Sequence, residues 1–192
     1  MEFLVVGLNH RTAPLEVRER LAVSKDSLPE ALRAMQDRGA PGVILCTCNR
    51  SEFYALEPDH LDGSVDGWGE GDERVKKFLV GYFDIPLLDV ERYIYVYRGV
   101  KCIRHLFRVV SGLDSMILGE KQVVGQVREA FAAAVRADTA PQPLSHLFQR
   151  ALRAGRRVRR DTAIGQNALS VSRVCVELAK GVLGDPSQLR VM

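Results

Sequence analysis

The stretch GVILCTCNRSEFYAL at residues 42–56 decides the fold, because it indicates two strands joined by a tight connection. Residues 42–45 form an apolar run typical of a buried strand, and residues 51–56 form a second run with aromatic character. The connection at residues 47–50 falls between them. Catalytic groups often lie on loops that rigid strands hold in place, so we expect function near this connection.

The connection carries a thiol, Cys48, two residues before the guanidinium of Arg50. The thiolate is the nucleophilic form of cysteine, and a nearby cation favours it, so Arg50 is the local candidate for that role. The alternative is that Cys46 and Cys48 are small buried hydrophobic residues at a strand end. Strand alternation places Cys46 and Cys48 on one face and Thr47 on the other.

Around this hairpin, the first hundred residues alternate strands and helices in the order β-α-β-β-α-β. The predicted elements are a strand at 3–8, a helix at 27–38, strands at 42–45 and 51–56, a loop at 59–71, a helix at 72–82 and a strand around 93–97. This order predicts an α+β fold with a ferredoxin-like split βαβ sheet, antiparallel and covered by helices on one face.

The second half of the chain has only helical patterns. Helices are predicted at 100–110, 120–136, 144–160 and 168–183, separated by glycines and by the Pro141-Gln142-Pro143 turn, and the last residues, 189–192, resemble the start of a strand. The sheet is therefore followed by a helical segment.

Composition excludes several classes of protein. A chain of 192 residues with 46% hydrophobic residues is long enough to form a core. No signal peptide is evident and no apolar run approaches the roughly 20 residues of a membrane span, so we expect a soluble, cytoplasmic protein. The four cysteines, Cys46, Cys48, Cys102 and Cys175, include no CxxC pair, so reduced thiols and no metal site are expected.

Arginine is concentrated at residues 149–160, although the net charge of the chain is only +3. Apolar residues at helical spacing predict an amphipathic helix with one packed face and one basic face. The alternative is an ordinary solvated helix surface. Acidic residues usually alternate with basic ones on such surfaces, but residues 149–160 contain no acid and the first one that follows is Asp161. The pattern favours contact with nucleic acid that does not depend on base sequence.

Several motifs together resemble one family, the glutamyl-tRNA reductases. They are GLNHRTAP at 7–14, RER at 18–20, TCNRSE at 47–52, SGLDS at 111–115 running into LGE at 118–120, and RVR at 157–159. The resemblance covers nearly the whole chain. It implies an enzyme that reduces glutamate carried on its tRNA to glutamate-1-semialdehyde with NADPH, the first step of tetrapyrrole (porphyrin) biosynthesis by the five-carbon route.

The resemblance also implies roles for the reacting groups. Cys48 matches the family nucleophile, whose thiolate would displace the tRNA hydroxyl and hold glutamate as a thioester, which accepts hydride more readily than a carboxylate does. His105 matches a catalytic histidine that would polarise the ester carbonyl or protonate the departing hydroxyl. The sequence does not choose between these two roles. A lone histidine on a helix is otherwise usually structural.

Arg50 would grip a carboxylate bidentately and so select glutamate; its alternative role is a surface ion pair with Glu52 or Glu57. Positions matching the substrate-binding residues of the family are Thr47, Asn49, Arg50, Ser115, Glu120, Lys121, Gln122 and Gln126. Lys121 stands where the family often has proline.

Two matched positions, Glu120 and His10, and one departure from the family, Cys46, have plainer interpretations. Glu120 would also suit the acidic first turn of a helix. Cys46 stands where relatives often carry serine, so we expect it to contribute to packing, and His10 would brace the loop.

Family members carry a nucleotide-binding domain and a dimerisation region that these residues do not include. The sequence contains no GxGxxG, so the NADPH site is expected outside this chain. We therefore expect a catalytic glutamyl-tRNA-binding domain at 1–160, a helical linker at 161–192, and a longer protein that is a homodimer. Glutamate-1-semialdehyde aminomutase is a candidate partner for product transfer. A non-catalytic glutamyl-tRNA-binding module and a thiol-dependent esterase are the rival functions.

Overall fold

A four-stranded antiparallel sheet lies at the centre of the computed structural model, which describes residues 1–57, 70–120, 122–165, 176 and 178–182. The strands are β1 (Glu2–Asn9), β2 (Gly42–Thr47), β3 (Arg50–Glu57) and β4 (Tyr95–Arg98). They lie side by side in the order β2-β3-β1-β4, and every neighbouring pair is antiparallel. The predicted α+β class is confirmed, and each predicted strand lies within two residues of an observed one.

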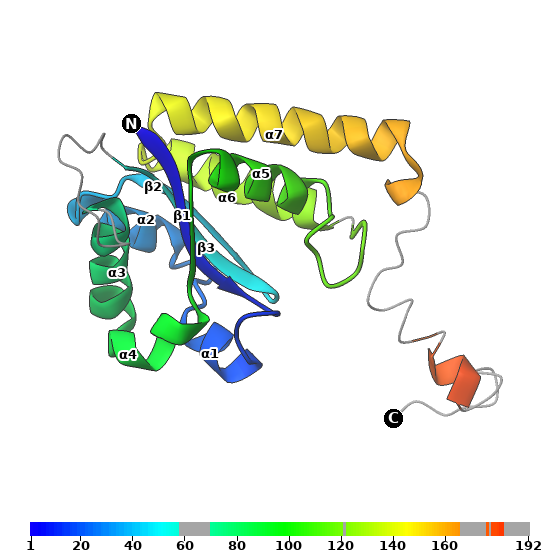
Figure 1. Ribbon diagram of the computed structural model, residues 1–192, viewed down its shortest axis with the longest axis horizontal. Helices are drawn as coiled ribbons and strands as arrows, with labels where there is room; N and C mark the ends of the chain where they lie inside the picture. The colour runs from blue at the N-terminus through cyan, green and yellow to red at the C-terminus, as the bar shows by residue number, and fades with distance from the viewer. Residues whose placement is uncertain (58–69, 121, 166–175, 177, 183–192) are drawn as a thin grey trace.

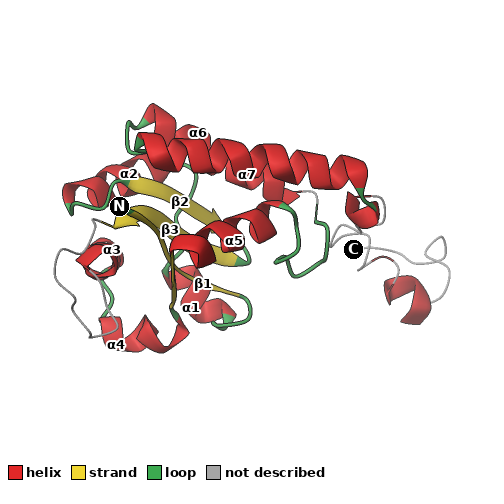
Figure 2. Cartoon of the chain, turned by 45° about the horizontal axis from the view of Figure 1, so that its top comes forward, coloured by secondary structure: helices red, strands yellow, loops and turns green. Residues whose placement is uncertain are grey.

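Helices cover both faces of this sheet (Figures 1 and 2). The helices are α1 (Leu15–Arg20), α2 (Leu28–Asp37), α3 (Glu70–Phe83), α4 (Leu87–Val90), α5 (Gly99–Val110), α6 (Gln122–Arg136) and α7 (Gln142–Asp161), with short 3₁₀ turns at Glu91–Tyr93 and Ala163–Gly165. α2 and α3 pack on one face, α5 and α6 pack on the other, and α7 lies over α5 and α6. The prediction of helices on one face was wrong, because the late helices form the second cover.

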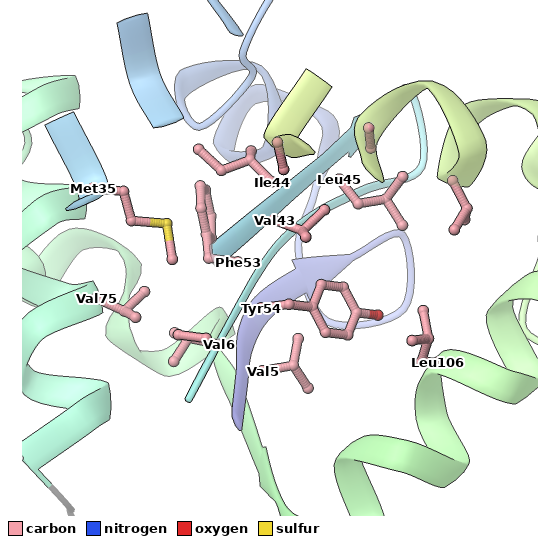
Figure 3. Close-up of a cluster of buried hydrophobic side chains, with 14 of the residues drawn as sticks. Val5, Val6, Met35, Val43, Ile44, Leu45, Phe53, Tyr54, Val75 and Leu106 are labelled. Carbon is pink, nitrogen blue, oxygen red and sulfur yellow. The ribbon is translucent and has the colours of Figure 1, made fainter. Parts of the chain in front are cut away.

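Successive residues of β3 show why both faces need a cover. Phe53 lies edge-on to Phe78 of α3, with ring centroids 5.6 Å apart, whereas Tyr54 lies edge-on to Phe148 of α7 at 5.2 Å. Figure 3 shows the same division, with Phe53 near Met35 and Tyr54 on the side of α5. Adjacent side chains of a strand point to opposite faces, so the unbroken apolar runs of β1 and β2 are buried on both sides.

Some predicted segments lie outside the described residues. Residues 59–69 of the predicted loop are not described, and its last two residues, 70 and 71, belong to α3. Of the helix predicted at 168–183, only residues 176 and 178–182 are described. The strand start predicted at 189–192 also lies outside. Within the described part of the chain, no helix is long and apolar enough to cross a membrane.

Candidate active site

The turn between β2 and β3 presents Cys48 to solvent. Cys48 and Asn49 form this turn, and the side chain of Cys48 is exposed. The hydroxyl of Thr47 accepts hydrogen bonds from the backbone N–H groups of Asn49 and Arg50, at 3.1 and 3.2 Å. Such local hydrogen bonds fix the shape of a turn, so the thiol stands at the tip of an ordered hairpin.

Two neighbouring segments hold the turn from outside. The N–H of His10, just after β1, donates to the carbonyl of Asn49 at 2.9 Å, and the guanidinium of Arg18 in α1 donates to the carbonyl of Cys48. Arg18 therefore brings a positive charge to the residue that carries the thiol. Arg50, the cation expected there from the sequence, directs its guanidinium onto the face of the sheet instead.

Arg50 is buried, with 2% of its side chain exposed, and it forms ion pairs with two acids. Its Nη1 donates to Oε1 of Glu52 at 2.7 Å and to Oδ2 of Asp114 at 3.3 Å, and its Nη2 donates to the carbonyl of Asp114. Arg11 binds the other carboxylate oxygen of Asp114 at 3.2 Å. The pairing of Arg50 with Glu52 exists, but it is a buried contact and not the surface ion pair that was the alternative.

Glu52 is fully buried and lies at the centre of this cluster. Its Oε1 accepts from Arg50, from the hydroxyl of Tyr95 at 2.6 Å and from Nε2 of His105 at 2.8 Å, and its Oε2 accepts from the hydroxyl of Tyr54 at 2.6 Å. Burial alone would raise the pKa of Glu52, but the charge of Arg50 and the hydrogen bonds from His105 and Tyr54 hold it well below its ordinary value. Glu52 is therefore a carboxylate that can only accept hydrogen bonds.

Gly7 of β1 makes room for the cluster. The register pairs Gly7 with Glu52 on one side and with Tyr95 on the other. Paired residues of antiparallel strands project from the same face, so Glu52 and Tyr95 can meet over the missing side chain. A Cβ added to Gly7 would lie 2.9 Å from both Cγ of Glu52 and the carbonyl oxygen of Ser51.

His105 comes from α5, which covers this face. Its ring lies 5.4 Å from that of Tyr95 and 5.1 Å from that of Tyr97, measured between centroids. Because ionised Glu52 only accepts hydrogen bonds, Nε2 of His105 must carry the hydrogen between them. Nδ1 is then the nitrogen of His105 that is not engaged by Glu52.

A glycine-hinged loop after α5 carries Asp114 and Ser115. Gly112 and Gly119 adopt φ angles of 74° and 79°, which L side chains rarely adopt, and the N–H of Gly119 donates to the carbonyl of Gly112 at 2.9 Å. Arg159 of α7 donates to the carbonyl of Gly119 at 3.1 Å and to that of Glu120. Ser115 is buried in this loop and Glu120 is half-buried.

Gln122 and Gln126 of α6 line a groove of about 700 Å³ at the edge of β2, between α6 and the residues that begin α2. Cys46 also lines this groove, and its Sγ lies 3.3 Å from Oγ of Ser51. Burial raises the pKa of the Cys46 thiol, which fits the packing role expected of it. Cys46 pairs with Ser51, the neighbour of Glu52 in β3, so Cys46 and the groove lie on the face of the sheet opposite to the Glu52 cluster.

A family model described as the N-terminal domain of glutamyl-tRNA(Glu) reductase matches residues 6–162. The chain belongs to this family. Glutamyl-tRNA reductases of Pelobacter propionicus and Pelotomaculum thermopropionicum are 42% and 44% identical to it over 100% and 96% of the chain. The solved glutamyl-tRNA reductase from Methanopyrus kandleri is 33% identical with a TM-score of 0.68, and the match covers 95% of this chain and 40% of that one. The chain spans about two fifths of the length of the curated relatives, 43% and 40%.

The structure places the described positions that match the reductase family in four parts of the chain: the hairpin end, the cluster around Glu52, the loop after α5 and the groove. Thr47, Cys48 and Asn49 form the hairpin end, and Arg50 and His105 join the cluster around Glu52. Ser115 and Glu120 lie in the loop after α5, and Gln122 and Gln126 lie in the groove. Lys121 is outside the described residues.

Sequence reasoning missed Glu52, Asp114, Tyr95 and Arg18 as parts of the candidate site. One signal was available: Arg50, Glu52 and Tyr54 alternate along β3, so a cation, an acid and a hydroxyl share one face of a strand. Buried charges are normally paired, so that face had to meet further polar groups. The contribution of Asp114 carried no comparable signal, because it depends on how the loop after α5 folds back.

Proposed function

We propose that this chain is the catalytic domain of a glutamyl-tRNA reductase that acts in tetrapyrrole biosynthesis, with Cys48 as the nucleophile. The observation that carries the proposal is the exposed thiol of Cys48 at the tip of a turn held by Thr47, His10 and Arg18. An aminoacyl ester is already activated, so a fixed thiolate needs no further activation of the acyl group.

The first step is acylation of Cys48. The sulfur attacks the ester carbonyl carbon of glutamyl-tRNA, an S–C bond forms, the C–O bond to the tRNA ribose breaks, and the proton given up by the Cys48 thiol ends on the ribose oxygen. We assign His105 to this step through Nδ1, since Nε2 is held by Glu52. It would either protonate the ribose oxygen or polarise the carbonyl.

We assign recognition of the glutamyl group to Arg50 and to the other positions that match substrate-binding residues of the family. Arg50 can hold the glutamate side chain bidentately if that carboxylate takes the place of Asp114 on the guanidinium. The hydroxyl of Thr47 and the amide of Asn49 would contact the ester, and Ser115, Glu120, Lys121, Gln122 and Gln126 would complete the substrate contacts.

We assign no NADPH site to this chain. The sequence contains no GxGxxG, the glycine pattern that binds the pyrophosphate of a dinucleotide, so we place the hydride donor outside residues 1–192. With a thioester formed and no hydride available, water is the competing acceptor, and slow hydrolysis dependent on Cys48 is expected of this chain alone.

We also propose a sheet class, a division of the chain into two parts, an oligomeric state, a cellular location and a partner. We assign the sheet to the ferredoxin-like split βαβ class, because the order β2-β3-β1-β4 interleaves two βαβ units. We divide the chain into a catalytic part at 1–160 and a linker at 161–192, in a cytoplasmic homodimer that passes its product to glutamate-1-semialdehyde aminomutase.

The test is a single-turnover incubation with glutamyl-tRNA labelled on the glutamate, quenched with acid, for wild type, Cys48→Ser and Cys46→Ser. Label that stays with wild type and with Cys46→Ser, is released by hydroxylamine and is lost in Cys48→Ser supports the proposal. If no label is retained and deacylation in wild type equals that in Cys48→Ser, the thiol is not the nucleophile and a glutamyl-tRNA-binding module is the better assignment. Faster turnover of small esters than of glutamyl-tRNA would favour a thiol-dependent esterase.

A further inference from the structure

We infer that the groove between α6 and the residues before α2 binds the 3′-terminal nucleotides of the tRNA whose glutamyl group reacts at Cys48. The inference rests on the proposed function for the identity of the RNA. Its own basis is the shape and charge of the groove and an unusual glycine in α6.

The groove and the reacting thiol are linked by strand β2. Cys46 of β2 lines the groove, and Cys48 follows two residues later in the turn. An acyl group bound at Cys48 must have its ester oxygen, and therefore the terminal ribose, within a few bonds of the thiol. The groove, with about 700 Å³ of space, is within the range that encloses a ligand of nucleotide size.

The groove is lined by apolar side chains that suit a base and by basic side chains that suit phosphates. Val23, Leu28, Ile44 and Ala133 supply an apolar surface for a base. Lys25, Arg128 and Arg136 stand along the same groove, and the acid that joins them in the lining is Glu129, whose carboxylate pairs with Lys25 at 2.9 Å. The groove therefore has an excess of positive charge over an apolar floor, which matches a base joined to phosphates.

Gly125 gives a second, independent observation. It lies in the interior of α6 and lines the groove, and a Cβ added there would meet no atom within 4 Å. Glycine destabilises a helix interior relative to alanine, and in this helix no packing contact requires it. A ligand that approaches the backbone of α6 closely would require glycine at this position, and the open space beside Gly125 leaves room for such a ligand.

The experiment measures binding of the trinucleotide CpCpA to the 192-residue chain by calorimetry. Gly125→Leu fills the groove from a position with room for the side chain, and Gly181→Leu is the matched control, because an added Cβ there also meets nothing within 4 Å and Gly181 does not line the groove. Saturable binding to wild type and to Gly181→Leu, weakened about tenfold or more in Gly125→Leu, is the expected result.

Arg128→Glu gives a second route that does not alter the helix backbone, and it should weaken binding to a similar degree with an unchanged melting temperature. Equal affinity of wild type and Gly125→Leu, or no saturable binding to wild type, overturns the inference. Acylation of Cys48 is measured on the same proteins: acylation without CpCpA binding overturns this inference alone, and CpCpA binding without acylation overturns the proposed function alone.

Discussion

At the scale of the residue, Glu52 matters most, because one buried carboxylate orders Arg50, His105 and two tyrosines. Removing one partner of a buried ion pair leaves the other charge without compensation. We expect Glu52→Gln to lower the free energy of unfolding by roughly 3 kcal/mol near neutral pH, measured by urea denaturation. Glu19→Gln is the control; Glu19 is exposed, and its change should stay within about 0.5 kcal/mol.

The difference in the free energy of unfolding between wild type and Glu52→Gln should disappear at acidic pH. The pKa of Glu52 is lower in the folded chain than the value of about 4.3 expected when unfolded. A lowered folded pKa stabilises the protein at pH values above the unfolded pKa, and that stabilisation is lost as the pH falls below it. The gap between wild type and Glu52→Gln should therefore narrow steadily below about pH 4, and a gap that stays constant would show that the charge of Glu52 does not stabilise the fold.

Two glycine-to-alanine changes should have opposite effects. Gly7→Ala forces a Cβ to within 2.9 Å of Glu52 and of the backbone, and should destabilise by about 1–3 kcal/mol. Gly125→Ala adds a Cβ in open space and removes a helix-interior glycine, so it should stabilise by roughly 0.5–1 kcal/mol. Thermal unfolding of both variants checks this, and the idea fails if Gly7→Ala is as stable as wild type.

At the scale of the element, strands and long helices followed from the sequence, and short helices did not. The apolar runs of β1, β2 and β3 identify strands, and amphipathic spacing identifies α5, α6 and α7. α1 has six residues and α4 has four, too few for a helical period to show. Cys48 and His105 were predicted as site residues through the family resemblance, and these predictions remain untested, whereas Asp114 contacts Arg50 only through tertiary folding.

Helix α7 carries its own prediction. Arg150 and Arg153 are exposed on the face opposite to the packed residues Ala151 and Leu152. If this face binds tRNA phosphates, Arg150→Gln with Arg153→Gln should weaken tRNA binding and reduce the slope of log affinity against log salt by about 0.7–0.9 for each phosphate that is no longer neutralised. Filter binding at several salt concentrations measures the slope, with Arg33→Gln on the exposed face of α2 as control. An unchanged slope would assign α7 to an ordinary solvated surface.

At the scale of the whole molecule, the sheet depends on helices that come after it in the chain. α5 and α7 cover Tyr54 and the side chains beside it, so a chain ending at residue 98 would expose one face of the sheet. We expect residues 1–98 to lack cooperative unfolding and residues 1–165 to keep it, because every buried hydrophobic residue in the described part of the chain precedes residue 153. Near-ultraviolet circular dichroism during denaturation distinguishes them, and a cooperative transition in 1–98 would contradict the expectation.

The ion pairs around Arg50 also have a consequence for electroneutrality. Arg11 and Arg50 balance Glu52 and Asp114, so the cluster has no net charge before substrate arrives. A glutamyl side chain adds one negative charge to this balanced cluster, whereas a glutaminyl side chain adds none. Under the proposed function, binding of a glutamyl ester should therefore be accompanied by uptake of a proton that a glutaminyl ester does not require, and proton uptake followed with a pH indicator separates the two.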